Sequence, residues 1–195
     1  MSWRRCMTGW LAVAGFTAQA LVPFGAPLRA EPPRILSPYK SMFAPGGRMR
    51  TGAHPAIDFD GRIGDPVLAA ADGTVVYAAE STLCGNGIWL RHDAFGLYTL
   101  YCQLEKIHVR LGDAVTRGQV IAALGVSGEP TLRAVHPREP IPMLHFGLGT
   151  ARMARFDGEL ENTLDPMSMT VGCFDAAKTY SADRLVLTYP LRCKD

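Results

Sequence analysis

The sequence predicts an all-β protein with closely spaced strands, and two observations carry that prediction. Between residues 56 and 149, short runs rich in Val, Ile, Leu and Tyr are separated by Gly-Asp and Asp-Gly turns. Hydrophobic residues make up 48% of the 195-residue chain and charged residues 19%, a balance that supports a buried core and argues against disorder. No segment of this region requires a long helix.

The first 30 residues are typical of an export signal. Arg4 and Arg5 precede an apolar stretch from Trp10 to Phe24, and small residues before Glu31 fit a cleavage site. Because the stretch is shorter than the ~20 apolar residues that span a bilayer and is broken by Gly and Pro, a removed signal is favoured over an uncleaved anchor. We therefore expect a secreted or periplasmic protein with no stable membrane span after signal removal.

The charge balance argues against a nucleic-acid partner. The chain has 20 Lys and Arg against 18 Asp and Glu, and the excess lies in the first 30 residues. The remainder is nearly neutral and has no basic run, whereas binding to phosphates needs clustered Lys and Arg. Nucleic-acid binding is therefore excluded as a function class.

Four cysteines would remain after signal removal, because Cys6 lies within the signal. An even set of cysteines in an exported chain predicts two disulfides. Proximity along the chain favours the pairs Cys84–Cys102 and Cys173–Cys193. A zinc–cysteine cluster is the rival interpretation, and the absence of any Cys-x-x-Cys motif argues against it.

The chain after the signal divides into three parts. Residues 31–53 are rich in Pro, Gly and Arg, have no hydrophobic period and are interpreted as a lead-in segment. Residues 54–150 form the predicted β core. Residues 151–195 form a C-terminal tail, which the Cys173–Cys193 disulfide would pin.

Local patterns define the strands of the core. The segments 64–76 and 112–121 each show a turn, a strand, a second turn and a second strand. Residues 87–92 and 97–104 flank the turn 93–96 and predict a β-hairpin. The two repeated segments are similar to lipoyl- and biotinyl-type carrier hairpins, but their turns lack the Lys that such carriers modify, which argues against a carrier function.

Three side chains form a candidate metal site. His54 and Asp58 are four residues apart and would share a face of a strand or a helix. Strict alternation over residues 142–148 places His145 on the face opposite Leu144 and Phe146. Two imidazoles and one carboxylate can bind Zn²⁺ tetrahedrally and leave one position for water. On these residues alone, a structural role for each histidine stays open.

An ordered series of motifs changes that interpretation. Along the chain the motifs are His54-x-x-x-Asp58, Gly64-Asp65-Pro66-Val67, Asp72-Gly73-Thr74-Val75, Tyr101-x-x-Leu104, Gly112-Asp113-x-Val115, Gly125-Val126-Ser127-Gly128 and Leu144-His145-Phe146. Over residues 50–150 this series resembles the lysostaphin/LytM-type zinc endopeptidases. The resemblance implies a compact antiparallel β-sheet with a groove, one zinc ion bound by His54, Asp58 and His145, and peptidoglycan peptides as substrates.

Two positions depart from the family pattern. Gln103 and Met143 stand where active members carry the histidines that assist the zinc-bound water and the oxyanion. Such general acid–base groups each contribute about 10²–10⁴-fold to the rate. Gln103 can donate a hydrogen bond but cannot exchange a proton near pH 7, and Met143 can do neither usefully. His136 and Glu139, in a loop longer than the family's, are candidate substitute bases, although a surface role for His136 is favoured.

Two functional hypotheses follow. The first is an exported, zinc-binding peptidoglycan endopeptidase-like protein with reduced activity. The second is an inactive pseudoenzyme that binds peptidoglycan or activates a cell-wall amidase. The remaining histidines, His92 and His108, are expected to be partly exposed and structural.

Overall fold

The computed structural model describes residues 30–82, 84–128, 141–150 and 160–194. The predicted signal lies almost wholly outside the described residues, as do the candidate bases His136 and Glu139. The strands are β1 (Ile35–Ser37), β2 (Ala56–Asp60), β3 (Pro66–Leu68), β4 (Gly73–Ser81), β5 (Gly85–His92), β6 (Leu97–Ile107), β7 (Ala114–Val115), β8 (Val120–Leu124), β9 (Met143–Gly149) and β10 (Thr163–Leu164).

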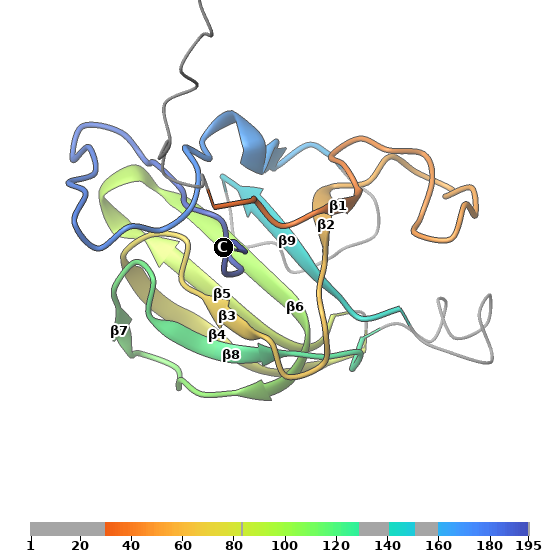
Figure 1. Ribbon diagram of the computed structural model, residues 1–195, viewed down its shortest axis with the longest axis horizontal. Helices are drawn as coiled ribbons and strands as arrows, with labels where there is room; N and C mark the ends of the chain where they lie inside the picture. The colour runs from red at the N-terminus through yellow and green to blue at the C-terminus, as the bar shows by residue number, and fades with distance from the viewer. Residues whose placement is uncertain (1–29, 83, 129–140, 151–159, 195) are drawn as a thin grey trace, which may run out of the picture.

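These strands form one ten-stranded antiparallel sheet, shown in Figure 1. Its main path runs β1-β2-β9-β6-β5-β4-β7, while β10 extends the pairing of β9, and β8 pairs with both β3 and β6. Only two short 3₁₀ turns, at 93–95 and 166–168, occur among the described residues, and no α-helix. The predicted all-β, antiparallel fold is confirmed.

The predicted hairpin and the predicted alternation both appear in the sheet. Strands β5 and β6 pair antiparallel across the turn Asp93–Phe95, which ends at Gly96 in the left-handed region with φ 63°. In β9, Leu144, Phe146 and Leu148 are fully buried in the main core. His145, between them, points to the opposite face of the sheet.

The main core fixes the strands that carry the candidate site. Phe59 of β2, Phe146 of β9 and Tyr101 of β6 lie side by side, with ring centroids 6.3 Å apart for Phe59–Phe146 and 5.2 Å for Tyr101–Phe146. All three are at most 1% exposed, and full burial of a Phe-sized side chain contributes about 1.5–3 kcal/mol. The three central strands therefore present their other face on a rigid base.

Both predicted disulfides are present. The Cα atoms of Cys84 and Cys102 are 5.0 Å apart, and those of Cys173 and Cys193 are 5.9 Å apart. The first links β6 to the residue preceding β5, and the second closes the C-terminal segment on itself.

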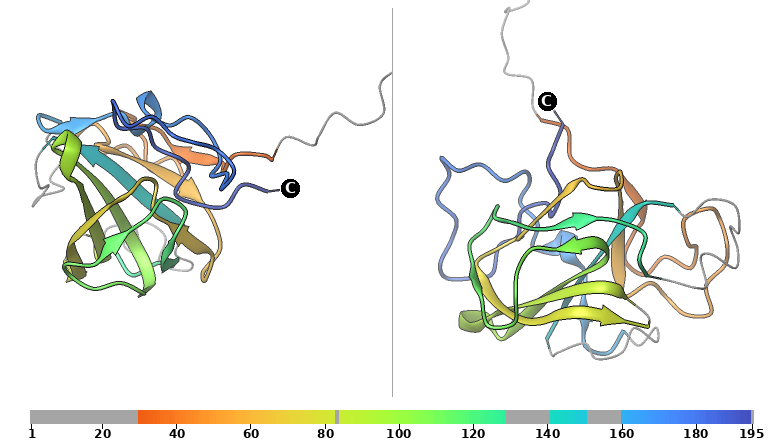
Figure 2. Two further views of the ribbon diagram at one scale, coloured as in Figure 1. Left: turned by 90° about the vertical axis from the view of Figure 1, so that its left-hand side faces the viewer. Right: turned by 90° about the horizontal axis from the view of Figure 1, so that it is seen from below.

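The segments before and after the core contribute to it, although neither shows a hydrophobic period. Strand β1, within the lead-in segment, pairs with β2, and residues 38–54 form an arm that projects from that edge (Figure 1). The C-terminal segment, seen in blue along one side of the sheet in Figure 2, inserts Leu187 and Leu191 into the main core. Arg117 anchors it by donating hydrogen bonds to the carbonyls of Ala70 and Val186.

In the part of the chain that the structure describes, no helix has the length and apolar character needed to cross a membrane.

Candidate metal centre

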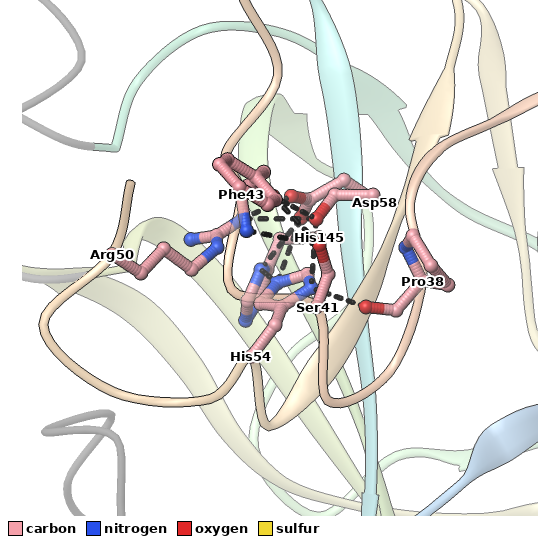
Figure 3. A network of polar contacts seen from close by, with 8 residues as sticks. Pro38, Ser41, Phe43, Arg50, His54, Asp58 and His145 are labelled. Carbon is pink, nitrogen blue, oxygen red and sulfur yellow. Dashed lines mark hydrogen bonds and ion pairs between the residues drawn. The ribbon is translucent and has the colours of Figure 1, made fainter. Parts of the chain in front are cut away.

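Sheet pairing brings the three predicted ligands together. Asp58 on β2 is the direct register partner of His145 on β9, and His54 lies two residues before the start of β2. Side chains of directly paired residues lie on the same face of a sheet. The ligand atoms of His54, Asp58 and His145 all lie within 4.8 Å of one another, so the structure brings the predicted set to one point (Figure 3).

The distances among these atoms fit a tetrahedral ion. Asp58 Oδ1 lies 2.8 Å from His145 Nδ1 and 3.3 Å from His54 Nε2, and the two ring nitrogens are 3.2 Å apart. Ligands at ordinary zinc bond lengths in a tetrahedron are about 3.3 Å from one another. The three atoms therefore occupy nearly the corners that a zinc ion requires.

Hydrogen bonds on the far side of His54 set which nitrogen faces the cluster. His54 Nδ1 lies 3.2 Å from the carbonyl oxygen of Pro38, and a carbonyl can only accept. This contact favours the neutral tautomer that carries its proton on Nδ1, and in that tautomer the lone pair of Nε2 is free to bind a metal ion beside Asp58. Such a backbone partner, which fixes the tautomer and orientation of the ring, is typical of metal-ligating histidines.

Burial keeps His54 neutral and its neighbours keep Asp58 charged. Burial lowers the pKa of His54, and the hydrogen bond and charge of Asp58 offset this only in part. Burial alone would raise the pKa of Asp58, but the close polar contacts with His145 and His54 outweigh it and hold the pKa well below its usual range. A neutral imidazole and a carboxylate are the forms that bind a metal.

Arg50 completes the site, and no sequence pattern pointed to it. Its Nη2 donates to Asp58 Oδ2 at 2.9 Å and to Ser37 Oγ at 3.3 Å. Ser37, Pro38 and Arg50 all belong to the segment interpreted as a lead-in. A Pro- and Gly-rich stretch without periodicity carries no signal that would have indicated these contacts.

Gln103 and Met143, the two positions expected to depart from the family pattern, lie beside the cluster. Met143 is two residues before His145 on the same face, is 2% exposed and packs against Ala44 and Leu36. Gln103 follows Cys102, the register partner of His145, at a bulge where φ is 71°. Its backbone N–H donates to the carbonyl of Cys84, so this bond and the Cys84–Cys102 disulfide hold the bulge together.

The other two described histidines stand outside the cluster. His108 is exposed, in line with the expectation. The expectation that His92 is partly exposed was wrong, because its side chain is buried: Nδ1 lies 2.7 Å from the carbonyl of Asp72 and Nε2 lies 2.9 Å from Thr99 Oγ1. His92 is buried because the end of β5 packs under the turn at Asp72. The position of His92 next to a turn in the sequence does not reveal this contact.

The burial of His92 predicts acid sensitivity. Burial lowers the pKa of His92 below the usual 6.5, so below that pH the unfolded chain binds a proton that the folded chain does not. The stabilising effect of the neutral ring should be complete above pH 6.5 and decline as the pH falls through the lowered folded-state value. Denaturant unfolding of the zinc-free protein at pH 7.5 and pH 5.5 should show this loss. The His92→Gln variant should lose less stability between these pH values than wild type, and the His108→Ala variant should lose as much as wild type. Equal losses in wild type and both variants would show that His92 is not responsible.

Comparison with known proteins identifies the family. The model of peptidase family M23 matches residues 52–156, more than half of the chain. The chain belongs to peptidase family M23. The resemblance noted from the motifs is thereby confirmed at the level of the family, and the three clustered side chains lie within the matched M23 region.

Individual M23 relatives support the assignment. Over 87 residues the chain is 36% identical to the peptidoglycan DD-endopeptidase ShyB of Vibrio cholerae. The matched region covers 45% of this chain and 20% of ShyB. It therefore spans about a fifth of the length of that curated relative. The lysostaphin catalytic domain of Staphylococcus simulans is 28% identical, with a TM-score of 0.50, over 71% of this chain and 90% of that domain. A zinc-containing peptidase from Vibrio cholerae is likewise 28% identical, with a TM-score of 0.50, over 70% and 39% of the two chains.

Proposed function

We propose that this chain is an exported, zinc-binding M23 protein that acts on peptidoglycan peptides, with slower hydrolysis than members carrying both catalytic histidines. The observation that carries the proposal is the convergence of His54, Asp58 and His145 within 4.8 Å on one face of the sheet. The name of the relative ShyB, a peptidoglycan DD-endopeptidase, supports the substrate class.

The residues present suit a zinc ion. His54 Nε2, Asp58 Oδ1 and His145 Nδ1 would hold it, since their mutual distances of 2.8–3.3 Å match the ligand spacing of tetrahedral zinc. A zinc ion bound there polarises a carbonyl group and lowers the pKa of a bound water. The carbonyl of Pro38 keeps the proton of His54 on Nδ1, and Arg50 neutralises the charge of Asp58 on the side away from the imidazoles.

Reduced activity follows from the two substituted positions. The Gln103 amide can donate a hydrogen bond to developing negative charge but cannot accept and return a proton near pH 7. The thioether of Met143 is a weak acceptor and is buried against Ala44 and Leu36. We therefore expect electrostatic assistance at this centre without the proton transfer that each imidazole provides.

The packing of Met143 favours a second candidate function. A side chain that joins the arm to the sheet by apolar contact serves packing rather than proton transfer. On this alternative the protein is a pseudoenzyme that binds peptidoglycan or activates a cell-wall amidase.

A peptidoglycan digestion experiment distinguishes the two functions. The full-length protein should release soluble fragments from purified peptidoglycan slowly, and both a zinc chelator and the His145→Ala substitution should abolish this release. The His108→Ala variant, altered at an exposed histidine outside the cluster, serves as the matched control and should behave as wild type. Zinc-loaded protein that binds peptidoglycan without releasing fragments would contradict the enzyme and support the binding function.

A further inference from the structure

The two oxygens of Asp58 have different partners. Oδ1 faces the imidazoles, 2.8 Å from His145 Nδ1 and 3.3 Å from His54 Nε2. Oδ2 accepts a hydrogen bond of 2.9 Å from Arg50 Nη2, and Figure 3 shows the Arg50 side chain reaching the carboxylate from the arm. The carboxylate is fully buried, so each of its oxygens depends on these protein partners.

The arm holds Arg50 in this position. The backbone N–H of Arg50 donates to the carbonyl of Met42 at 2.7 Å. The N–H of Ala44 donates to the carbonyl of Arg48 at 2.8 Å, so two backbone hydrogen bonds join the two sides of the arm. Ala44 in turn packs on Met143 of β9. The guanidinium is thus fixed to the sheet by the arm's own hydrogen bonds and by one apolar contact.

The placement of Arg50 leaves one of its own donors unsatisfied. Its Nε is buried and has no hydrogen-bond partner. Leaving a buried donor unpaired is unfavourable, so local hydrogen bonding of the arginine does not by itself explain where it lies. The ion pair with Asp58 does, since a charge-assisted bond to a buried carboxylate is among the stronger polar contacts.

From this division of oxygens we propose that Arg50 is a positioning residue of the metal centre, which retains Oδ2 of Asp58 so that only Oδ1 is available to the ion. The inference rests on the proposed zinc site. A carboxylate released from Arg50 could turn and offer both oxygens, which raises the coordination number above the four that suit a tetrahedral zinc site. Strand β1 and the arm, residues 35–54 together, then support the metal centre and are not a dispensable lead-in.

Metal binding by the full-length protein tests the assignment without relying on activity. The Arg50→Ala variant should bind zinc about 10–100-fold more weakly in a chelator competition, the loss typical when an outer hydrogen-bond partner of a ligand is removed. Its cobalt-substituted form should absorb visible light less strongly than the cobalt-substituted wild type. The absorption of a four-coordinate cobalt centre falls when the metal gains a fifth ligand. Arg50→Lys, which keeps a point charge without the planar fork, should recover part of both signals.

A matched control lies on the same arm. Arg48 also has a buried, unpartnered Nε but makes no contact with the cluster among the described residues, so Arg48→Ala should leave affinity and spectrum unchanged. The assignment is overturned if Arg50→Ala binds zinc like wild type, or if Arg48→Ala loses as much affinity, since the arm's fold would then be responsible. A wild-type chain that binds no zinc would instead overturn the proposed function, and this assignment with it.

Discussion

Replacing Gln103 and Met143 together by histidine should raise the rate of peptidoglycan cleavage by at least about 10²-fold, because each imidazole restores a proton-transfer group. Both positions adjoin the cluster: Met143 precedes His145 by two residues on the same face, and Gln103 follows its register partner Cys102. The left-handed backbone at residue 103 accepts histidine more readily than most side chains. Fragment release from purified peptidoglycan measures the effect.

The substitution at residue 143 carries a stability cost that the experiment must include. A histidine placed in the buried contact with Ala44 and Leu36 should destabilise the fold by about 1–3 kcal/mol. Thermal unfolding and zinc content of the double variant show whether it is folded and loaded. The triple variant that also carries His145→Ala should lose the gained activity. A folded, zinc-loaded double variant with unchanged activity would mean that the missing imidazoles do not limit catalysis.

Replacing Asp58 by alanine should remove zinc binding almost completely, a loss larger than the 10–100-fold typical of outer hydrogen-bond partners. The variant loses the only anionic ligand of the set and leaves the Arg50 guanidinium facing two imidazoles. Breaking a buried ion pair in this way costs about 3 kcal/mol of stability, although Arg50 retains some solvent contact. Isothermal titration with zinc measures the loss.

Asp60, on the same strand, provides the matched control for Asp58. It forms a surface ion pair with Arg34 at 2.9 Å, a type of contact worth about 0–1 kcal/mol. Asp60→Ala should therefore bind zinc like wild type, and Asp58→Asn, which keeps the shape of the side chain, should fail to. Retention of stoichiometric zinc by Asp58→Asn would show that the carboxylate is not a ligand.

The elements that could be predicted from sequence are those with strong local patterns. The alternation around His145 fixed which residues of β9 face the core, and the turn at residues 93–96 located the β5–β6 hairpin. The even cysteine set and the short separations within each pair anticipated both disulfides. In each case the decisive information lies within a few residues along the chain.

The features that escaped prediction depend on contacts between distant segments without periodicity. Strand β1 has three residues and forms only because β2 offers an edge. Leu187 and Leu191 reach the core from an irregular segment pinned by Arg117 and the second disulfide. Arg50 belongs to a Gly- and Arg-rich arm, where nothing in the local sequence distinguishes it from Arg48. The metal cluster itself could be anticipated through the family motifs, but its supporting hydrogen bonds required the three-dimensional arrangement.

The most direct test is the metal content of the purified wild-type protein after dialysis against buffered zinc. The account predicts one zinc ion per chain, lost when His54, Asp58 or His145 is replaced and retained when His108 or Asp60 is replaced. Wild-type protein that is folded and carries no zinc would contradict it.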